Sequence, residues 1–183
     1  EWLDVAFATA LEICELADMI ALAVKLSRNG TGDYWDMADR WVRNLFVEGQ
    51  LKRVDRLNWL SERMPETEFP TEIPPHHCTD RVAERNIGAF VSTLGVNDQL
   101  PGGTIYMGSY LNGIGHCCTA NATRTIYYVW ENRITHEAGK LRVNLCLNRG
   151  SRWADVNSHI PYKGQVDVKV KESVELSVRI PEW

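Results

Sequence analysis

Two adjacent cysteines, Cys117 and Cys118, follow a glycine-rich stretch in the middle of the chain. Neighbouring thiols suit metal capture or nucleophilic chemistry. A third thiol and a nearby carboxylate occur close to the start of the chain, at Cys14 and Glu12. The two segments together offer four soft or borderline ligands, which is the number that a tetrahedral zinc site requires.

The backbone around these residues must meet a geometric condition if they share one ion. Residues i and i+2 of a helix point about 200° apart, so Glu12 and Cys14 cannot both reach an ion from within one helix. We predict that this pair lies in extended or turn backbone just before a helix. Cys117 and Cys118 would diverge by about 100° on a helix, but the preceding glycines allow an irregular entry that turns both sulfurs inward. In this prediction both ligand pairs precede helices, where free N–H groups and the helix dipole favour an ionised sulfur.

The remaining histidines and cysteines leave several interpretations open. Single cysteines are often small buried hydrophobic residues, and this is our interpretation of Cys146. His77 and Cys78 form either a competing ligand pair or part of a solvated, proline-rich loop. His116 either orients a substrate hydroxyl or caps the helix that follows it. The adjacent cysteines also have a redox alternative, in which they form a vicinal disulfide.

The composition is that of an ordinary soluble globular protein, with 44% hydrophobic and 24% charged residues. Acidic and basic residues are interspersed and give a net charge of −4, so we expect no nucleic-acid partner and no binding to a membrane surface. No apolar stretch is long enough to span a bilayer. The five cysteines are an odd number and fit no small secreted disulfide framework, so we expect a reducing, cytoplasmic location.

Hydrophobic periodicity predicts the elements that position these residues. Apolar residues recur at helical spacing in five segments, which predicts helices over residues 15–28, 34–46, 51–64, 81–91 and 119–132. Residues 97–115, rich in glycine, are expected to form a long loop. Beyond Gly139 apolar residues recur at every second position, over residues 141–148, 166–170 and 174–178. This alternation predicts an antiparallel β region. Helices followed by strands indicate an α+β fold with domains at 1–137 and 138–183.

Three segments resemble glycoside hydrolase family 127, the retaining β-L-arabinofuranosidase group. They are Glu12-Ile13-Cys14 before a helix, Cys117-Cys118-x-x-Asn121-x-x-Arg124, and the tail from Leu141-Arg142-Val143-Asn144-Leu145 to Arg179-Ile180-Pro181-Glu182-Trp183. The matches span nearly the whole chain in order. The combination of Glu-x-Cys with Cys-Cys-x-x-Asn is fairly specific, whereas the tail alone is a weak signal. Thr119-Ala120 stand where the family usually has prolines, which indicates a divergent branch and leaves the sugar open.

The resemblance implies a catalytic α/α toroid followed by an antiparallel β-sandwich, with Zn²⁺ held by Glu12, Cys14, Cys117 and Cys118. It also implies that Cys117 is the nucleophile of a glycosidase acting on L-arabinofuranosides or related glycans. In that chemistry the thiolate attacks the anomeric carbon and forms a thioglycosyl intermediate, which water resolves. The alternative is a module without turnover, either carbohydrate-binding or built around a structural zinc.

Further expectations follow from the same resemblance. The acid/base glutamate of the family lies further upstream of Glu-x-Cys than this chain extends, and Glu1 is a conceivable stand-in. Five helices cannot build a toroid of twelve, so we expect an internal fragment that is inactive without the N-terminal part of the same polypeptide. Tyr106 and Tyr110, in the glycine-rich loop, are expected to stack on the oligosaccharide or glycoside substrate, with His116 beside them.

Overall fold

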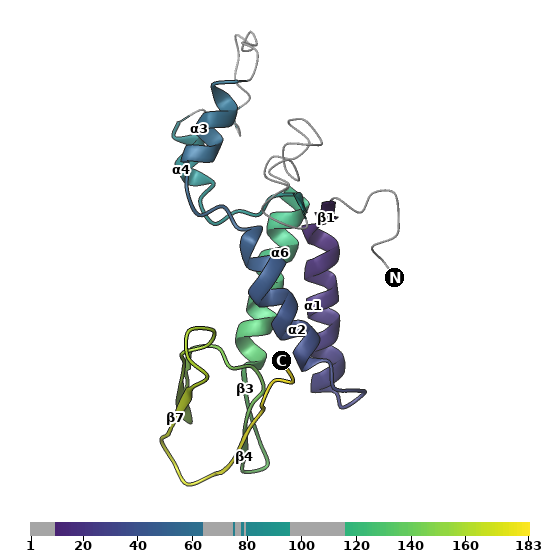
Figure 1. Ribbon diagram of the computed structural model, residues 1–183, viewed down its shortest axis with the longest axis vertical. Helices are drawn as coiled ribbons and strands as arrows, with labels where there is room; N and C mark the ends of the chain where they lie inside the picture. The colour runs from purple at the N-terminus through teal and green to yellow at the C-terminus, as the bar shows by residue number, and fades with distance from the viewer. Residues whose placement is uncertain (1–9, 64–74, 76–77, 79, 96–115) are drawn as a thin grey trace. The chain divides into compact units, whose positions relative to one another are not determined.

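The computed structural model describes residues 10–63, 75, 78, 80–95 and 116–183. These residues form both helices and β-sheets, in agreement with the predicted α+β class (Figure 1). The chain divides into two compact units, Glu1–Ile13 with Val47–Thr119, and Cys14–Phe46 with Ala120–Trp183. The domain boundary at residue 137 stays a prediction. In the described part of the chain, every helix is too short or too polar to cross a lipid bilayer.

The first unit contains a small antiparallel sheet, in which β1 (Ala10–Glu12) pairs with β2 (Thr93–Gly95). Its helices are α3 (Asp55–Ser61) and α4 (Val82–Arg85), both shorter than the helices predicted over 51–64 and 81–91. Helix α4 ends early because the following residues pair with another segment instead. The Gly88 N–H donates to the Leu51 carbonyl and the Leu51 N–H donates to the Ala89 carbonyl.

Helix α1 (Ile13–Arg28) belongs, from Cys14 onward, to the second unit and matches the helix predicted over residues 15–28. Its buried face carries Leu16, Ile20 and Val24 at helical spacing. The helix ends where Gly30 adopts a φ of +71°, a conformation that glycine takes without steric cost. The Thr31 N–H then donates to the Leu26 carbonyl and the Gly30 N–H to the Ser27 carbonyl, which together form a Schellman motif.

Helix α6 (His116–Asn132) lies beside α1, as Figure 1 shows. Its buried residues fall on one face, at Cys118, Ala122, Thr125 and Val129. The fully buried Thr125 hydroxyl donates to the Ala17 carbonyl of α1 at 3.0 Å, so this polar group is satisfied between the two helices.

The helix predicted over residues 34–46 is present in two parts. Helix α2 (Trp35–Trp41) continues into a short π-helical segment, η2 (Val42–Phe46). The helical geometry is interrupted at Asn44, whose φ and ψ are −95° and −106°. Trp35 and Ala38 of α2 are buried in the second unit.

Two three-stranded sheets complete the second unit. One has the order β3 (Ile134–Glu137), β4 (Lys140–Val143) and β8 (Glu175–Val178); the other has the order β5 (Arg149–Gly150), β6 (Ala154–Ser158) and β7 (Val166–Val170). Both contribute to one hydrophobic core, formed by Ile134, Leu141, Val143, Ala154 and Val156. All pairings are antiparallel as predicted except β4 with β8, which is parallel. The chain forms the second sheet between β4 and β8, and returns in the direction of β4.

The β region begins earlier than the sequence predicts, because β3 lies before Gly139, where the alternation of apolar residues begins. A two-residue turn at Ala138 and Gly139, with φ values of +49° and +75°, joins β3 to β4. Positive φ at both central positions matches the right-handed twist of a hairpin. The predicted strand over 141–148 is shorter in the structure and ends at Val143. The side-chain amide of the next residue, Asn144, donates to the Asn132 carbonyl at the end of α6.

A charged pair connects the chain's last segment to α2 within the second unit. Arg179 donates to the Asp36 carboxylate at 2.5 Å, and the exposed fractions of the two side chains are only 20% and 12%. Hydrogen bonding from Arg179 is the main cause that lowers the pKa of Asp36 below its ordinary value. Removing one partner of a pair this buried lowers the free energy of unfolding strongly, since the remaining charge loses the partner that balanced it.

We expect Arg179→Met to lower the free energy of unfolding by about 3 kcal/mol at pH 7, measured by urea denaturation. The exposed pair Lys140–Glu175 provides a control in the same unit, and Lys140→Met should cost less than about 1 kcal/mol. Because the folded pKa of Asp36 is lowered, its contribution is complete above the unfolded value near 3.9. The difference between Arg179→Met and the wild type should therefore shrink as the pH falls through the folded pKa. Equal costs for the two variants at pH 7 would contradict this account.

Candidate metal site

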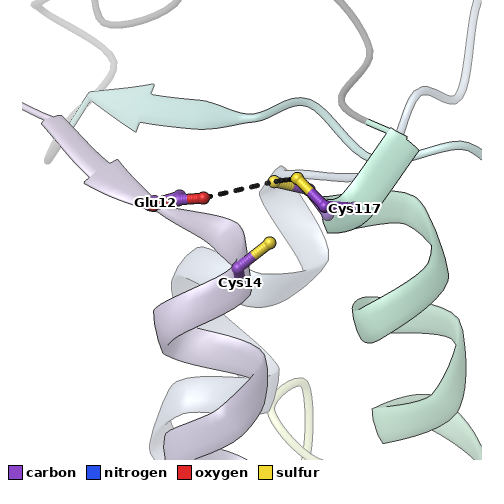
Figure 2. A group of neighbouring side chains, drawn as sticks. Glu12, Cys14 and Cys117 are labelled. Atoms are coloured by element: carbon purple, nitrogen blue, oxygen red, sulfur yellow. Dashed lines mark hydrogen bonds between the residues drawn. The ribbon is translucent and has the colours of Figure 1, made fainter.

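Four residues that the sequence singles out lie together in the structure. Glu12, Cys14, Cys117 and Cys118 each offer one ligand atom, and these atoms all lie within 4.8 Å of one another. Figure 2 shows Glu12, Cys14 and Cys117 with their side chains directed toward a common point. The cluster is able to hold a metal ion.

Glu12 and Cys14 reach this point from two kinds of backbone. Glu12 is the last residue of β1, where it is paired with Thr93 of β2. Cys14 is the second residue of α1, which begins at Ile13. The prediction that the pair cannot reach an ion from within one helix is therefore correct, because Glu12 is extended. The prediction that both residues precede the helix is wrong for Cys14.

The prediction that Cys117 and Cys118 precede their helix is also wrong, since α6 begins at His116. Both cysteines lie in its first turn, yet their Sγ atoms are only 3.7 Å apart. In a helix every Cα–Cβ bond tilts toward the N-terminus, so side chains of the first turn project beyond the helix end. Two neighbouring sulfurs can converge there although their positions on the helix differ by about 100°.

Backbone groups of residues 90–92 hold the beginnings of α1 and α6 in the first unit. The Ser92 carbonyl accepts the Ile13 N–H at 2.9 Å and lies 3.7 Å from the Cys118 Sγ, which donates to it. The Thr119 hydroxyl accepts the Phe90 N–H at 3.0 Å and donates to the Phe90 carbonyl at 3.3 Å. The sequence did not indicate that residues 90–92 contact the cluster, because these contacts are made by backbone atoms that every residue type possesses.

Two of the distances between the candidate ligand atoms can be compared with those of a tetrahedral zinc site. With Zn–S bonds of about 2.3 Å, two sulfurs of a tetrahedral site lie roughly 3.8 Å apart, close to the observed 3.7 Å between Cys117 and Cys118. A sulfur and a carboxylate oxygen lie roughly 3.6 Å apart in the same geometry, against 3.9 Å from the Cys118 Sγ to the Glu12 Oε1. Three thiols and one carboxylate also form a donor set of the type that zinc accepts.

The four ligands differ in their exposure to solvent. Cys118 is fully buried, Cys14 is intermediate, and Glu12 and Cys117 are exposed. The buried Cys118 sulfur lies 3.9 Å from the Glu12 carboxylate and 3.7 Å from the Ser92 carbonyl, either of which can accept its one proton, so it is enclosed on the protein side of the cluster. Cys117 is therefore the sulfur of the adjacent pair that a molecule from solvent can reach.

The other candidate residues lie in different places. His116 is exposed and is the first residue of α6, next to Cys117. Cys146 is buried as interpreted, although it lies outside the strands, and burial raises its pKa. Glu1, His77, Tyr106 and Tyr110 lie outside the described residues.

Cys78 is exposed and does not belong to the metal cluster found among the described residues. Its sulfur accepts the Asp80 N–H at 3.4 Å and an Arg85 guanidinium N–H at 2.8 Å. These two donors, the Asp80 N–H first, lower the pKa of Cys78.

No protein-family model, curated protein or solved structure matches this chain.

We expect metal removal to change which thiols react under native conditions. In the zinc-loaded protein, the exposed Cys78 outside the cluster should react quickly with a thiol reagent, whereas the partly enclosed Cys14 should be protected by the ion. After chelation, Cys14 should react faster. Thiol titration before and after chelation, with the modified cysteines identified by peptide mass analysis, measures this change, and Cys78→Ser should remove the reaction of Cys78 only. A Cys14 that reacts equally fast in both states would contradict metal binding at the cluster.

Proposed function

We propose that this chain carries the zinc-thiolate centre of a retaining glycoside hydrolase related to family 127, acting on L-arabinofuranosides or related glycans. The observation that carries the proposal is the cluster of Glu12, Cys14, Cys117 and Cys118, with ligand atoms within 4.8 Å of one another. The substrate class rests on the resemblance in the sequence. In this proposal the helices belong to an α/α toroid and the two sheets to the β-sandwich that follows it.

Cys117 is the proposed nucleophile because it combines exposure with membership of the cluster. A bound zinc ion would supply positive charge that keeps sulfur ionised at neutral pH. Glu12, Cys14 and Cys118 would hold the ion, and the enclosed Cys118 would serve as a ligand without meeting substrate. The first turn of α6 directs the Cys117 sulfur beyond the helix end.

The reaction proceeds in two displacements at the anomeric carbon. A lone pair of the Cys117 sulfur forms a C–S bond as the glycosidic C–O bond breaks, and the leaving oxygen takes a proton from a general acid. Water then attacks the same carbon, the C–S bond breaks and the thiolate is restored. The proton of the water passes to the conjugate base of the same acid. Two inversions give net retention at the anomeric carbon.

A second function, a structural zinc site without turnover, is favoured by one specific observation. The cluster offers four protein ligands, and structural zinc sites are closed by four protein ligands. The β sheets would then form a packing or carbohydrate-binding module. The two functions differ in what they require of Cys117.

We expect Cys117→Ala in the full-length protein to reduce hydrolysis of nitrophenyl furanosides by at least about 10³-fold, because no other exposed thiol of the cluster can replace the nucleophile. Steady-state kinetics measure the effect. Cys78→Ala, at an exposed cysteine outside the cluster, is the matched control and should keep full activity. Unchanged turnover in Cys117→Ala would overturn the glycosidase proposal.

We also expect Cys117→Ser to keep the fold while losing activity, whereas Cys14→Ser should lose both zinc and stability. Thermal unfolding with metal analysis of each purified variant compares the two. The physical reason is that Cys14 is partly enclosed, so Cys14→Ser loses a ligand and buried packing together, whereas Cys117→Ser loses only an exposed ligand. Equal destabilisation by both substitutions would favour the structural site.

A further inference from the structure

Asn121 and Arg124 belong to the sequence motif of the adjacent cysteines, but the cluster does not use them as ligands. Asn121 lies one helical turn after Cys117 on α6. Its side-chain amide donates to the backbone carbonyl of Cys14 at 3.1 Å and to the Asp18 carboxylate at 3.0 Å. One side chain of α6 thus binds the backbone of a residue that supplies a ligand from α1.

The surroundings fix the orientation of the Asn121 amide. Its oxygen accepts a hydrogen bond from Arg124, whose guanidinium also donates to Asp18 at 2.9 Å. Reversing the amide would place its oxygen against a carbonyl and a carboxylate, and its NH₂ group against a guanidinium. Asp18 and Arg124 therefore select the orientation in which Asn121 donates to Cys14.

We propose that Asn121 is a positioning residue for the metal centre, which sets the place of the Cys14 thiol relative to the two thiols of α6. The inference rests on the proposed zinc site and adds a residue that holds the ligands without touching the ion. The hydrogen bond acts at the Cys14 backbone, directly behind the side chain that carries the sulfur. A small shift of this backbone changes the distance from the Cys14 sulfur to the ion.

The Asp18–Arg124 pair orients the Asn121 amide but adds little to the free energy of folding. The exposed fractions of the two side chains are 62% and 53%, and exposed ion pairs contribute little to the free energy of folding. The α1–α6 contact has an independent buried hydrogen bond from Thr125 to Ala17. Loss of Asn121 should therefore leave the two helices packed while altering the metal site.

The experiment compares Asn121→Ala with the wild type in the full-length protein. Zinc affinity is measured by competition with a chromophoric chelator, and the ligand geometry by the absorption of Co²⁺ substituted at the site. We expect zinc binding 10- to 100-fold weaker, the range typical for residues that orient metal ligands, and altered Co²⁺ d–d and sulfur charge-transfer bands. The variant should still unfold cooperatively.

Asn132→Ala is the matched control, because Asn132 is on the same helix but donates to the Tyr128 carbonyl within α6. It should bind zinc and Co²⁺ as the wild type does.

The possible results distinguish a failure of the positioning role from a failure of the proposed function. Asn121→Ala with unchanged zinc affinity and unchanged Co²⁺ bands overturns the positioning role, even if the wild type is an active glycosidase. Equal losses in Asn121→Ala and Asn132→Ala also overturn it, since they indicate a general effect on α6. A wild type that binds neither ion overturns both proposals. Weaker zinc binding in Asn121→Ala without any glycosidase activity in the wild type supports the positioning role and removes the enzymatic one.

Discussion

Mutual repulsion among the ligands is the constraint on which the rest of this structure depends. A carboxylate and three thiolates within 4.8 Å would carry four negative charges, and each pair at about 4 Å repels by roughly 4 kcal/mol at an effective dielectric of 20. The groups can remain together only if thiols keep their protons or a cation balances them. With protons retained, Cys118 donates toward the Glu12 carboxylate, and a bound metal ion would replace those protons. Folding, protonation and metal content would thereby be linked at one point of the chain.

Much of this arrangement follows from residue pattern. The apolar spacing of Leu16, Ile20 and Val24 places α1, and the helix ends at the predicted residue, Arg28, just before Gly30. The mixed α+β character follows from the change of hydrophobic period after Gly139. The four residues of the cluster were also recognisable, because three thiols and a carboxylate match the number and type of donors of a zinc site.

Other features depend on information that side-chain identity does not carry. The start of α6 was placed too late because His116, Cys117 and Cys118 are ordinary in helix propensity, and contacts of Thr119 and Cys118 with residues 90–92 decide where the helix begins. The parallel pairing of β4 with β8 depends on the path of the intervening chain, which periodicity does not encode. The periodicity of apolar residues shows which face of a helix or strand is buried. The start of α6 and the pairing of β4 with β8 depend instead on contacts with backbone atoms that are distant in sequence.

The position of the ligands along the chain has a consequence for the unfolded state. Cys14 and Cys117 are separated by roughly 100 residues, and closing a loop of that length costs about 4–5 kcal/mol of chain entropy in the cross-link model developed for disulfides. An ion bound at both ends therefore acts as a reversible cross-link that bridges most of the chain. Unlike a disulfide, it is governed by the concentration of free metal rather than by redox potential. An ion at the proposed site would therefore make the concentration of free metal a variable in how compact the unfolded chain is and how readily it refolds.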